Sequence, residues 1–221
     1  MLFSVPGSGQ TPINSVPYTI HKPGNYFLHK NLTFGVASGT AITINSSNVT
    51  LDFNGHVLVS TVTPPTNPGL GVAVGTDKKA IENVTVKNGT ISRFLVGIDL
   101  GGSFASSTGH VVEEMRLTNH FSTGILSADL ASGCLVNNNY ISNCDKGIAD
   151  TGKYNQFIRN RTLNCPTAGI TCSGFGYLES NFVSNSTNGS NCGELAKLRF
   201  NTTLNCTTPF VGGTQITDDN N

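Results

Sequence analysis

One position of a repeating sequence unit carries cationic and aromatic side chains that could recognise an acidic group. In consecutive units this position holds Arg116, Tyr140, Arg161 and Phe182. A guanidinium group binds a carboxylate or sulfate through two parallel N–H groups, and an aromatic ring can stack on a sugar face or on an arginine. If the position points outward in every unit, these residues form a stripe suited to an acidic glycan.

A second row, two residues earlier in the units, would widen this stripe, because it includes Glu114 and Arg159. β-Elimination in a uronate needs a cation that neutralises the acid group and a base near the C5 proton. Arg161 or Arg159 could supply the cation, and Tyr140 the base. The residues then expected to bind the substrate are Arg116, Arg159, Phe182 and Glu114. The alternative is a solvated outer face on which the arginines lie over neighbouring aromatic rings.

The unit that positions these residues has the form apolar-x-x-Asn-x-apolar-x-Asn. It begins at Val136, Phe157, Leu178 and Leu198, at intervals of 21, 21 and 20 residues, and a weaker copy begins at Val112. A Gly-Ile pair recurs in step with the unit, at Gly97, Gly124, Gly147 and Gly169. Two independent markers with one period indicate that the units stack in a regular array.

Each unit contains two or three strands of about four or five residues, which are too short to enclose a core alone. Stacked coils about 4.8 Å apart would pair these strands in parallel and bury one apolar column per face. The pattern therefore predicts an all-β fold, a parallel β-helix with coils of about 20–27 residues. The repeated Asn is expected at a corner, where it tolerates a left-handed backbone and its amide can hydrogen-bond along the stack. A leucine-rich repeat has a similar period, but its L-x-x-L-x-L frame is missing.

The solenoid is expected to divide the chain into three parts. Residues 1–36 would start the solenoid and cover its open end, residues 37–211 would form the coils, and residues 212–221 would be a polar tail. Two stretches rich in Gly, Ser and Pro, 60–70 and 101–110, interrupt the repeat. Both are predicted to leave the wall of the solenoid as loops.

The charge balance argues against partners that depend on a strong net charge. The 221-residue chain has 13 Lys and Arg, 13 Asp and Glu, and only 12% charged residues, so general nucleic-acid or anionic-membrane binding is not expected. No apolar run approaches the about 20 residues that cross a bilayer, so no membrane insertion is expected. The N-terminus lacks the features of a signal peptide, so a secreted or cell-surface location would require that a signal has been removed.

The six cysteines all follow residue 130, and none has the C-x-x-C spacing of a metal site, so no metal and no other cofactor is predicted. Cys144, Cys165 and Cys206 follow the last Asn of their units, and Phe94 and Phe121 are expected in the same inward or corner column. Neighbouring coils bring Cα atoms within disulfide range, so Cys144 and Cys165 could form a bridge. Buried free thiols that pack as small apolar groups are the alternative.

Two further polar residues have predicted positions. His120 follows Asn119 and is expected to be an exposed coil residue, with a general-base role as the alternative. Asp150 falls level with Leu100, Ser127 and Cys172, at an inward or corner position, where turn hydrogen bonding is its expected role.

The segments VPYTIHKPGNYFLHKNLTF and GTAITINSSNVTLDFNGHVL, followed by NVTVKNGTI and the Gly-Ile units, give the chain a family resemblance. It resembles bacterial right-handed parallel β-helix repeat proteins of the pectate-lyase-like superfamily over nearly its whole length. The resemblance implies a single-stranded right-handed solenoid and a link to polysaccharides, since this superfamily includes lyases, polygalacturonases, epimerases and phage tailspikes.

Among these proteins, polygalacturonases have catalytic aspartates just before the Gly-Ile strand, and Asp145 is the matching acid here. The paired Asp and the Gly-His-Gly turn of that group are absent. Asp99 is the other outward acid near this strand, but the two carboxyl groups would be about 16 Å apart. Inversion of a glycosidic bond needs carboxyl groups about 6.5–9.5 Å apart, so a two-carboxylate hydrolase is not expected.

Three functions are consistent with these patterns. The first is a polysaccharide lyase or epimerase-like enzyme that acts on an acidic glycan, with Arg161, Tyr140 and Asp145 as catalytic candidates. The second is a noncatalytic extracellular solenoid with a structural or glycan-binding role, which the absence of a convergent acid–base cluster would favour. The third is a small-molecule enzyme with a pocket under the loops 60–70 and 101–110.

Overall fold

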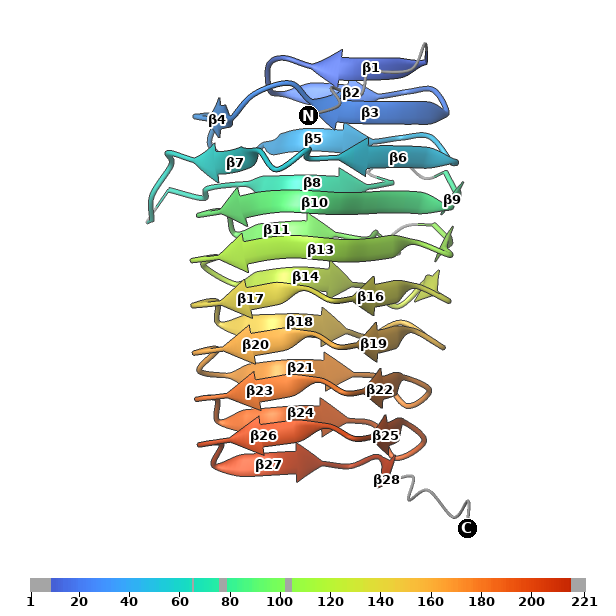
Figure 1. The fold of residues 1–221 in the computed structure, drawn as a ribbon, viewed down its shortest axis with the longest axis vertical. Helices are drawn as coiled ribbons and strands as arrows, with labels where there is room; N and C mark the ends of the chain where they lie inside the picture. Colours follow the sequence, from blue (N-terminus) through green and yellow to red (C-terminus); the bar gives the residue numbers. More distant parts are fainter. Residues whose placement is uncertain (1–8, 65, 76–78, 102–104, 216–221) are drawn as a thin grey trace, which may run out of the picture.

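The structure is a computed structural model that describes residues 9–64, 66–75, 79–101 and 105–215. In these ranges the chain contains strands and no helix, and the strands stack as a solenoid of about eight turns (Figure 1). The chain crosses the front from right to left and the back from left to right as it descends, so the solenoid is right-handed. The predicted right-handed parallel β-helix is therefore confirmed.

The solenoid has a front sheet of 16 strands, a back sheet of nine strands and a short sheet of three strands at one corner. Every pairing between neighbouring coils is parallel, so each coil adds one strand, or two, to the front sheet and one strand to the back sheet.

The front sheet consists of two rows of strands. The first row contains β1 (Gln10–Ile13), β3 (Gly24–Leu28), β6 (Val49–Asp52), β10 (Val84–Ser92), β13 (Val111–Thr118), β16 (Leu135–Asn137), β19 (Gln156–Ile158), β22 (Tyr177–Glu179), β25 (Lys197–Arg199) and β28 (Thr214–Gln215). The second row contains β4 (Leu32–Phe34), β7 (Val57–Ser60), β17 (Tyr140–Ser142), β20 (Arg161–Leu163), β23 (Phe182–Ser184) and β26 (Thr202–Leu204). The longer strands β10 and β13 belong to both rows, and in the later coils a bend separates the two.

The other two sheets complete the wall. The back sheet contains β2 (Tyr18–Ile20), β5 (Thr40–Ile44), β8 (Leu70–Val74), β11 (Val96–Asp99), β14 (Thr123–Ser127), β18 (Lys146–Asp150), β21 (Ala168–Cys172), β24 (Asn188–Cys192) and β27 (Thr208–Val211). The short sheet contains β9 (Ile81–Glu82), β12 (Ser107–Thr108) and β15 (Ala131–Ser132).

The apolar position that opens each sequence unit forms one buried column of the core. Its members are Leu51, Val86, Val112, Val136, Phe157, Leu178 and Leu198, which are Cα partners from coil to coil. All are fully buried. The alternation of apolar and polar residues thus directs one side chain per coil into a shared core. A single short strand could not enclose such a core without its neighbours.

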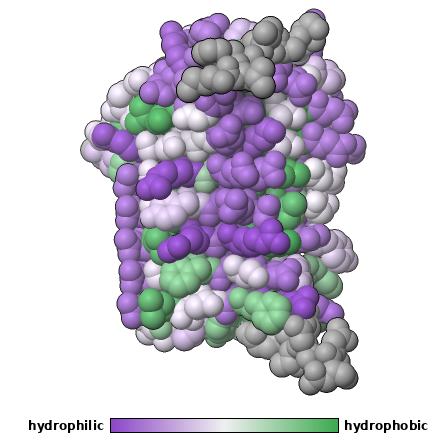
Figure 2. Space-filling model, viewed as in Figure 1, coloured by the Kyte–Doolittle hydropathy of each residue, from purple (hydrophilic) through white to green (hydrophobic). Residues whose placement is uncertain are grey.

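The two Asn positions of the unit form two different ladders. Asn139, Asn160 and Asn181 are buried inside the solenoid, and Asn201 continues their ladder as a half-buried residue. The Asn160 Nδ2 group donates to Asn181 Oδ1 at 3.1 Å and to the Val136 carbonyl at 2.8 Å. The second ladder is exposed and consists of Asn119, Asn143, Asn164, Asn185 and Asn205, all with positive φ and with amide bonds of 2.8–3.3 Å between neighbours. Figure 2 shows a continuous hydrophilic column at the edge where the turns after β17, β20 and β23 lie in Figure 1.

The Gly-Ile marker reflects close contact between neighbouring coils of the back sheet. A Cβ atom on Gly124 would lie 2.6 Å from the Gly147 carbonyl oxygen, and one on Gly147 would lie 2.4 Å from the carbonyl oxygen of Gly169. A larger residue would push the coils apart, so glycine recurs once per coil while the following isoleucine fills the core.

The two predicted loops lie at opposite edges of the solenoid. Residues 61–64 and 66–69 join the front strand β7 to the back strand β8, whereas 101 and 105–110 join β11 to β13 at the other edge (Figure 1). The second loop also contains β12, which pairs with β9 and β15 and so belongs to the wall. The described parts of these loops therefore do not roof one common pocket, as the small-molecule interpretation requires.

The predicted cysteine column is correct except for one residue. Cys144 follows Asn143 and Cys165 follows Asn164 in adjacent coils, and His120 occupies the equivalent place after Asn119. His120 is only 2% exposed, whereas Phe121 is 42% exposed, so the predictions of an exposed His120 and an inward Phe121 are both wrong. The Asn at the corner sets the register, and the next residue points inward whatever its hydrophobicity.

The strands nearest the chain ends also pair within the sheets of the solenoid. Strands β1 to β4 already pair within the sheets, and β28 lies inside the segment 212–221 that was expected to be a tail. Residues 1–8 and 216–221 lie outside the described residues. One coil is also longer than expected, with paired residues Asn48 and Asn83 separated by 35 positions, because additional residues leave the wall between β7 and β10.

Candidate functional site

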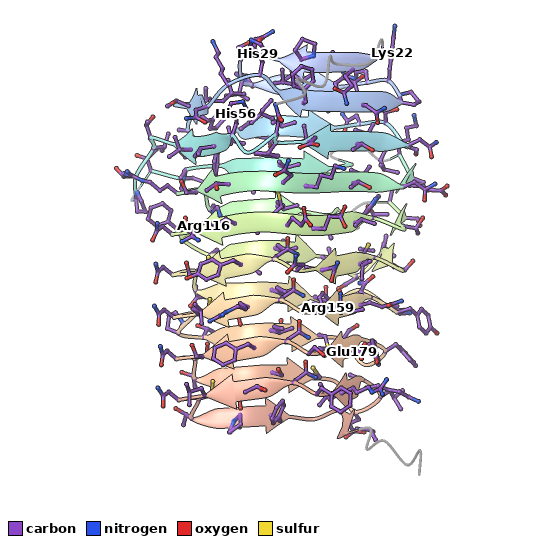
Figure 3. All side chains as sticks on the ribbon, in the orientation of Figure 1. Lys22, His29, His56, Arg116, Arg159 and Glu179 are labelled. Carbon is purple, nitrogen blue, oxygen red and sulfur yellow. The ribbon has the colours of Figure 1, made fainter. Side chains whose placement is uncertain are left out.

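The four cationic and aromatic residues of the repeated position lie side by side on the front sheet. Arg116 on β13, Tyr140 on β17, Arg161 on β20 and Phe182 on β23 are Cα partners in consecutive coils. Parallel neighbours are about 4.8 Å apart, so the four side chains form a row along the solenoid axis. We call this row the arginine–aromatic stripe; Figure 3 shows Arg116 near the left edge of the front face.

The guanidinium groups of the stripe lie against the rings of the next coil. Arg116 Cζ is 4.4 Å from the centroid of the Tyr140 ring, and Arg161 Cζ is 5.1 Å from that of Phe182. Both arginines are exposed and both rings are half-buried. A ring face that carries a guanidinium group cannot also carry a sugar, so the expected sugar stacking is replaced by arginine–ring stacking. The rings then hold the guanidinium planes and leave their N–H edges to solvent.

Glu114 and Arg159 lie beside this stripe at the bend between the two rows of the front sheet. Their φ values are 55° and 54°, and both side chains are exposed. In the later coils the left-handed residue, such as Arg159, separates a first-row strand from a second-row strand and precedes the inward Asn. Glu114 lies within the continuous strand β13 and precedes the buried Met115. Arg159 is labelled nearer the middle of the front face in Figure 3.

The stripe arginines lack acidic partners among the described residues. The ion pair found there joins Arg199 Nη1 and Glu179 Oε1 at 3.8 Å, on the first row of the front sheet. No described carboxylate oxygen lies within 4.0 Å of Arg116, Arg159 or Arg161. An external anion would therefore meet no competing carboxylate of the described residues at that distance.

The structure brings together two of the three catalytic candidates. Tyr140 and Arg161 are direct neighbours in the stripe. Asp145 lies beyond the exposed Asn ladder, in the turn that leads to β18, and its Oδ1 atom accepts a hydrogen bond from the Thr167 hydroxyl. Asp145 thus lies around a corner from the stripe and does not join Tyr140 and Arg161 in one site.

A second group of polar residues lies inside the solenoid near the short sheet, and sequence reasoning did not identify it. Ser107 Oγ is 2.6 Å from His110 Nε2 and donates to the Leu100 carbonyl, also at 2.6 Å. The Val84 N–H donates to His110 Nδ1, so the neutral imidazole carries its proton on Nε2 and donates it to Ser107. His110 therefore cannot act as a base towards Ser107. The one sequence feature that could have indicated this group is the position of His110, directly before the strand that contains Val112.

Asp150 belongs to the same interior corner. Its Oδ1 atom accepts hydrogen bonds from Asn155 Nδ2 at 2.7 Å and from the Gly152 N–H at 3.0 Å. The side chain is 3% exposed, and burial raises the pKa of its carboxyl group. The predicted role of Asp150 in turn hydrogen bonding is confirmed.

The perturbed titratable groups are mostly interior ones. Burial lowers the pKa of His110 and of His120 to about 4, raises that of Cys134 to about 11, and also raises the pKa of Asp99. A cluster of such groups beneath the two loops was the pattern expected of an enzyme. They are hydrogen-bonded inside the wall, however, with His110 fully buried, so their pKa shifts arise from the packed core rather than from a cleft.

The described residues show no cluster of three or more His, Cys, Asp or Glu side chains that could hold a metal ion. Cys144 and Cys165 are both free thiols in adjacent coils. Of the two predicted alternatives, a disulfide or buried free thiols, the structure shows the buried free thiols. Among the described segments, none forms a helix long and apolar enough to span a membrane.

No family model matches the chain, and no curated protein matches it significantly. Among solved structures, the chain is similar to the A-module of the mannuronan C-5 epimerase AlgE4 from Azotobacter vinelandii. The TM-score is 0.31 and the sequence identity is 13%, over 95% of this chain and 89% of that chain.

Proposed function

We propose that this β-helix binds an acidic glycan through the arginine–aromatic stripe on its front sheet. The observation that carries the proposal is the pair of exposed guanidinium groups, Arg116 and Arg161, held against Tyr140 and Phe182 without a described carboxylate partner. A guanidinium group presented by its edge suits bidentate recognition of a carboxylate or sulfate. An extracellular or cell-surface location, where such glycans occur, is part of the proposal.

The rigidity of the solenoid favours binding to an extended ligand. Each stripe residue is fixed by a parallel pairing on both sides, and the buried Asn ladder lies directly beside the row. Little conformational freedom is left to lose when a ligand binds, except in the arginine side chains, which the rings already restrain. Arg159 adds a third cation two residues from Arg161 on the same coil.

A lyase or epimerase is the second candidate, because Tyr140 lies between Arg116 and Arg161 in the stripe. In such a reaction an arginine would neutralise a uronate carboxylate, and the phenolic oxygen of Tyr140 would take or return the C5 proton. In elimination, the electrons of the C5–H bond form the C4–C5 double bond as the glycosidic C4–O bond breaks. In epimerisation, a proton returns to C5 on the opposite face of the ring. Asp145 has no part in this scheme.

Incubation with a panel of acidic and neutral polysaccharides distinguishes the two candidates. Binding is measured by calorimetry, elimination by the ultraviolet absorbance of unsaturated uronides, and epimerisation by proton NMR of the polymer. Arg161→Ala is expected to weaken acidic-glycan binding about tenfold. The matched control is Arg199→Ala, because Arg199 already has Glu179 as its ion-pair partner.

Each outcome selects one function. Binding without a change in the polymer supports the binding protein, and product formation that Tyr140→Phe abolishes supports the enzyme. Unchanged binding in Arg161→Ala, or equal losses in the Arg161 and Arg199 variants, would place the glycan elsewhere and refute the stripe as the site.

A further inference from the structure

Two of the six cysteines are direct neighbours on paired strands of the back sheet. Cys172 ends β21 and Cys192 ends β24, and the two residues are Cα partners in adjacent coils. Both are free thiols that point into the solenoid, with exposures of 6% and 5%. Parallel neighbours are about 4.8 Å apart, which falls within the Cα separations of about 4.4–6.8 Å that disulfides span. The register therefore allows a covalent bridge between these two coils.

The side chains of this pair are already in contact. Cys172 and Cys192 share a side-chain hydrogen bond, which raises the pKa of the Cys172 thiol. In the coil that follows, Gly212 lies against the Cys192 carbonyl group and has no side chain of its own. Cys172 is therefore the cysteine next to Cys192 in this column of the core.

The packing around Cys172 favours an internal bridge over a bulky adduct. A Cβ atom added to Gly176 would lie 2.9 Å from Cys172 Sγ, so the sulfur is tightly enclosed. A disulfide replaces two thiol hydrogens and needs less volume than the two thiols, whereas a glutathione adduct would overpack this corner. Oxidation here is expected to join Cys172 to Cys192 rather than to leave a mixed disulfide.

The other four cysteines have different neighbours. The Cys134 N–H donates to Asn155 Oδ1 in the next coil. Cys206 follows Asn205, and the equivalent place in the preceding coil belongs to Ser186. Cys144 and Cys165 share a hydrogen bond with each other. The fold thus leaves Cys172 and Cys192 without a competing cysteine at contact distance.

A bridge at this place would strengthen the end of the solenoid at which strand pairing is incomplete. Among the described strands, β26 and β27 pair on one side only. All four residues of β27 are exposed or half-buried, whereas three of the five residues of β24 are buried. Solenoids open most easily where a coil has a neighbour on one side only. A covalent link from β21 to β24 would fix the coil on which β27 stacks.

We infer that Cys172 and Cys192 form a disulfide when the chain folds in an oxidising environment, and that this bridge holds the C-terminal coils together. The two thiols lose two protons and two electrons as one S–S bond forms. A disulfide oxidant such as oxidised glutathione takes up both and leaves as two molecules of reduced glutathione. The inference does not depend on the glycan site, although the proposed extracellular location would supply such conditions.

The test refolds the full chain from denaturant in a buffer that contains reduced and oxidised glutathione. Remaining thiols are alkylated with iodoacetamide, and the unreduced protein is cut with trypsin and a glutamate-specific protease. Cleavage after Arg161, Glu179 and Glu194 places Cys172 in 162–179 and Cys192 in 180–194. Mass spectrometry is expected to find these two peptides linked, and fragmentation distinguishes Cys172 from Cys165, which lies in the same peptide.

Thermal unfolding measures what the bridge contributes. The protein refolded with glutathione is compared with the same protein refolded in a reductant, and Cys192→Ser is the matched variant. The rise in midpoint is expected to be about 6–12 °C larger in the unmodified protein, because the bridge closes a loop of about 20 residues. Any bridge between Cys144 and Cys165 is kept in both proteins and cancels. Ser186 is an inward serine with 5% exposure, so serine suits such a place.

Each result decides one part of the inference. Recovery of Cys172 and Cys192 as alkylated thiols, or linkage of either one to another cysteine, overturns the bridge. A Cys172–Cys192 link with equal midpoint shifts in the two proteins overturns its role at the C-terminal end. If Cys192→Ser does not fold, Cys172→Ser replaces it in the comparison, and the linked peptides of the unmodified protein still test the pairing.

Discussion

Burial divides the polar side chains of this protein into two groups with different roles. The stripe arginines are exposed and have no described carboxylate partner, so their charge is available to a ligand. His110, His120 and Asp150 are enclosed, and their hydrogen bonds go to the backbone and to neighbouring side chains. Perturbed pKa values therefore mark the structural core in this protein, whereas the candidate site is marked by missing partners.

The buried histidines make stability depend on pH. The pKa of His110 is about 4 in the folded state and about 6.5 when unfolded, so the unfolded state binds more protons in between. Stability is fully present above pH 6.5 and falls as the pH drops to about 4, by up to about 3 kcal/mol for this residue. Thermal unfolding of the unmodified protein over this range is the measurement.

The matched variant is His110→Asn, because Asn155 occupies the same column and its Oδ1 atom accepts the Cys134 N–H as His110 Nδ1 accepts that of Val84. The variant is expected to reduce the pH dependence between 4 and 6.5, and His120, whose pKa is also lowered to about 4, supplies the histidine contribution that remains. The raised pKa values of Asp99 and Asp150 act in the opposite sense in both proteins and cancel in the comparison. An unchanged slope would show that His110 is protonated in the folded state.

The cysteines predict a selective labelling experiment. Cys134, Cys144 and Cys165 are at most 1% exposed, Cys172 and Cys192 are 6% and 5% exposed, and Cys206 in the last coil is half-buried. Burial raises the pKa of the Cys134 thiol, and the hydrogen bond with the Cys192 side chain, followed by burial, raises the pKa of the Cys172 thiol; thiolate is the reactive form. An aromatic disulfide reagent should therefore label Cys206 quickly and the other five only on unfolding. Cys206→Ser should remove the fast phase, and several fast thiols in the native protein would contradict the packing described.

At the scale of the elements, the two Asn ladders differ in what they contribute. The inner ladder satisfies buried backbone groups, since Asn160 Oδ1 accepts both the N–H and the Nδ2 group of Asn139. The outer ladder occupies left-handed turns that already face water. The same residue type in the same repeat unit thus has a core function at one place and a turn function at the other.

Asn160→Leu is expected to destabilise the protein by about 3 kcal/mol, because it removes the acceptor of the buried Asn139 N–H and Nδ2 groups and the side-chain donor to the Val136 carbonyl. For a chain of this size the unfolding midpoint should fall by about 6–12 °C. The control is Asn164→Gly, which keeps the left-handed turn and removes only exposed hydrogen bonds, and it should shift the midpoint much less. Equal shifts in the two variants would mean that the inner ladder is not a buried network.

The repeat unit was sufficient to predict the strands, the core column and the outward stripe, because all three depend on positions within one coil. Predictions that required the register between coils with irregular corners were less accurate. Phe121 was assigned to the core because it is apolar, yet the turn at Asn119 places His120 there. The strand β12 has only two residues, and it exists because β9 and β15 flank it, which no local pattern reveals.

The candidate site could likewise be predicted where it depends on positions within the repeat unit, and not where it depends on the corners between coils. The register of Arg116, Tyr140 and Arg161 followed from the spacing alone, and so did the stacking of arginines on rings as one of two alternatives. The separation of Asp145 from the stripe depends on the exposed Asn corner between them, which a comparison of sequence positions does not show. The interior Ser107–His110 pair arises from a loop that returns to the wall.

At the scale of the whole molecule, the fold predicts a spectrum dominated by β structure. Strands cover most of each coil, and the described ranges contain no helix. Far-ultraviolet circular dichroism of the full chain is therefore expected to show a single β-type minimum with negligible helical signal. A helical spectrum in dilute buffer would contradict the solenoid, and addition of a helix-inducing alcohol supplies the positive control.

Because each coil of the stripe supplies one residue, adding or removing coils changes the order of cations and rings along it. Each of the four coils from β13 to β23 contributes one residue to the stripe, so insertion of a single coil between β17 and β20 would put Arg161 and Phe182 out of phase with Arg116 and Tyr140. Insertion of two coils would restore the phase. The number of coils therefore obeys a parity rule: even changes preserve the order of cations and rings, and odd changes invert it on one side of the insertion.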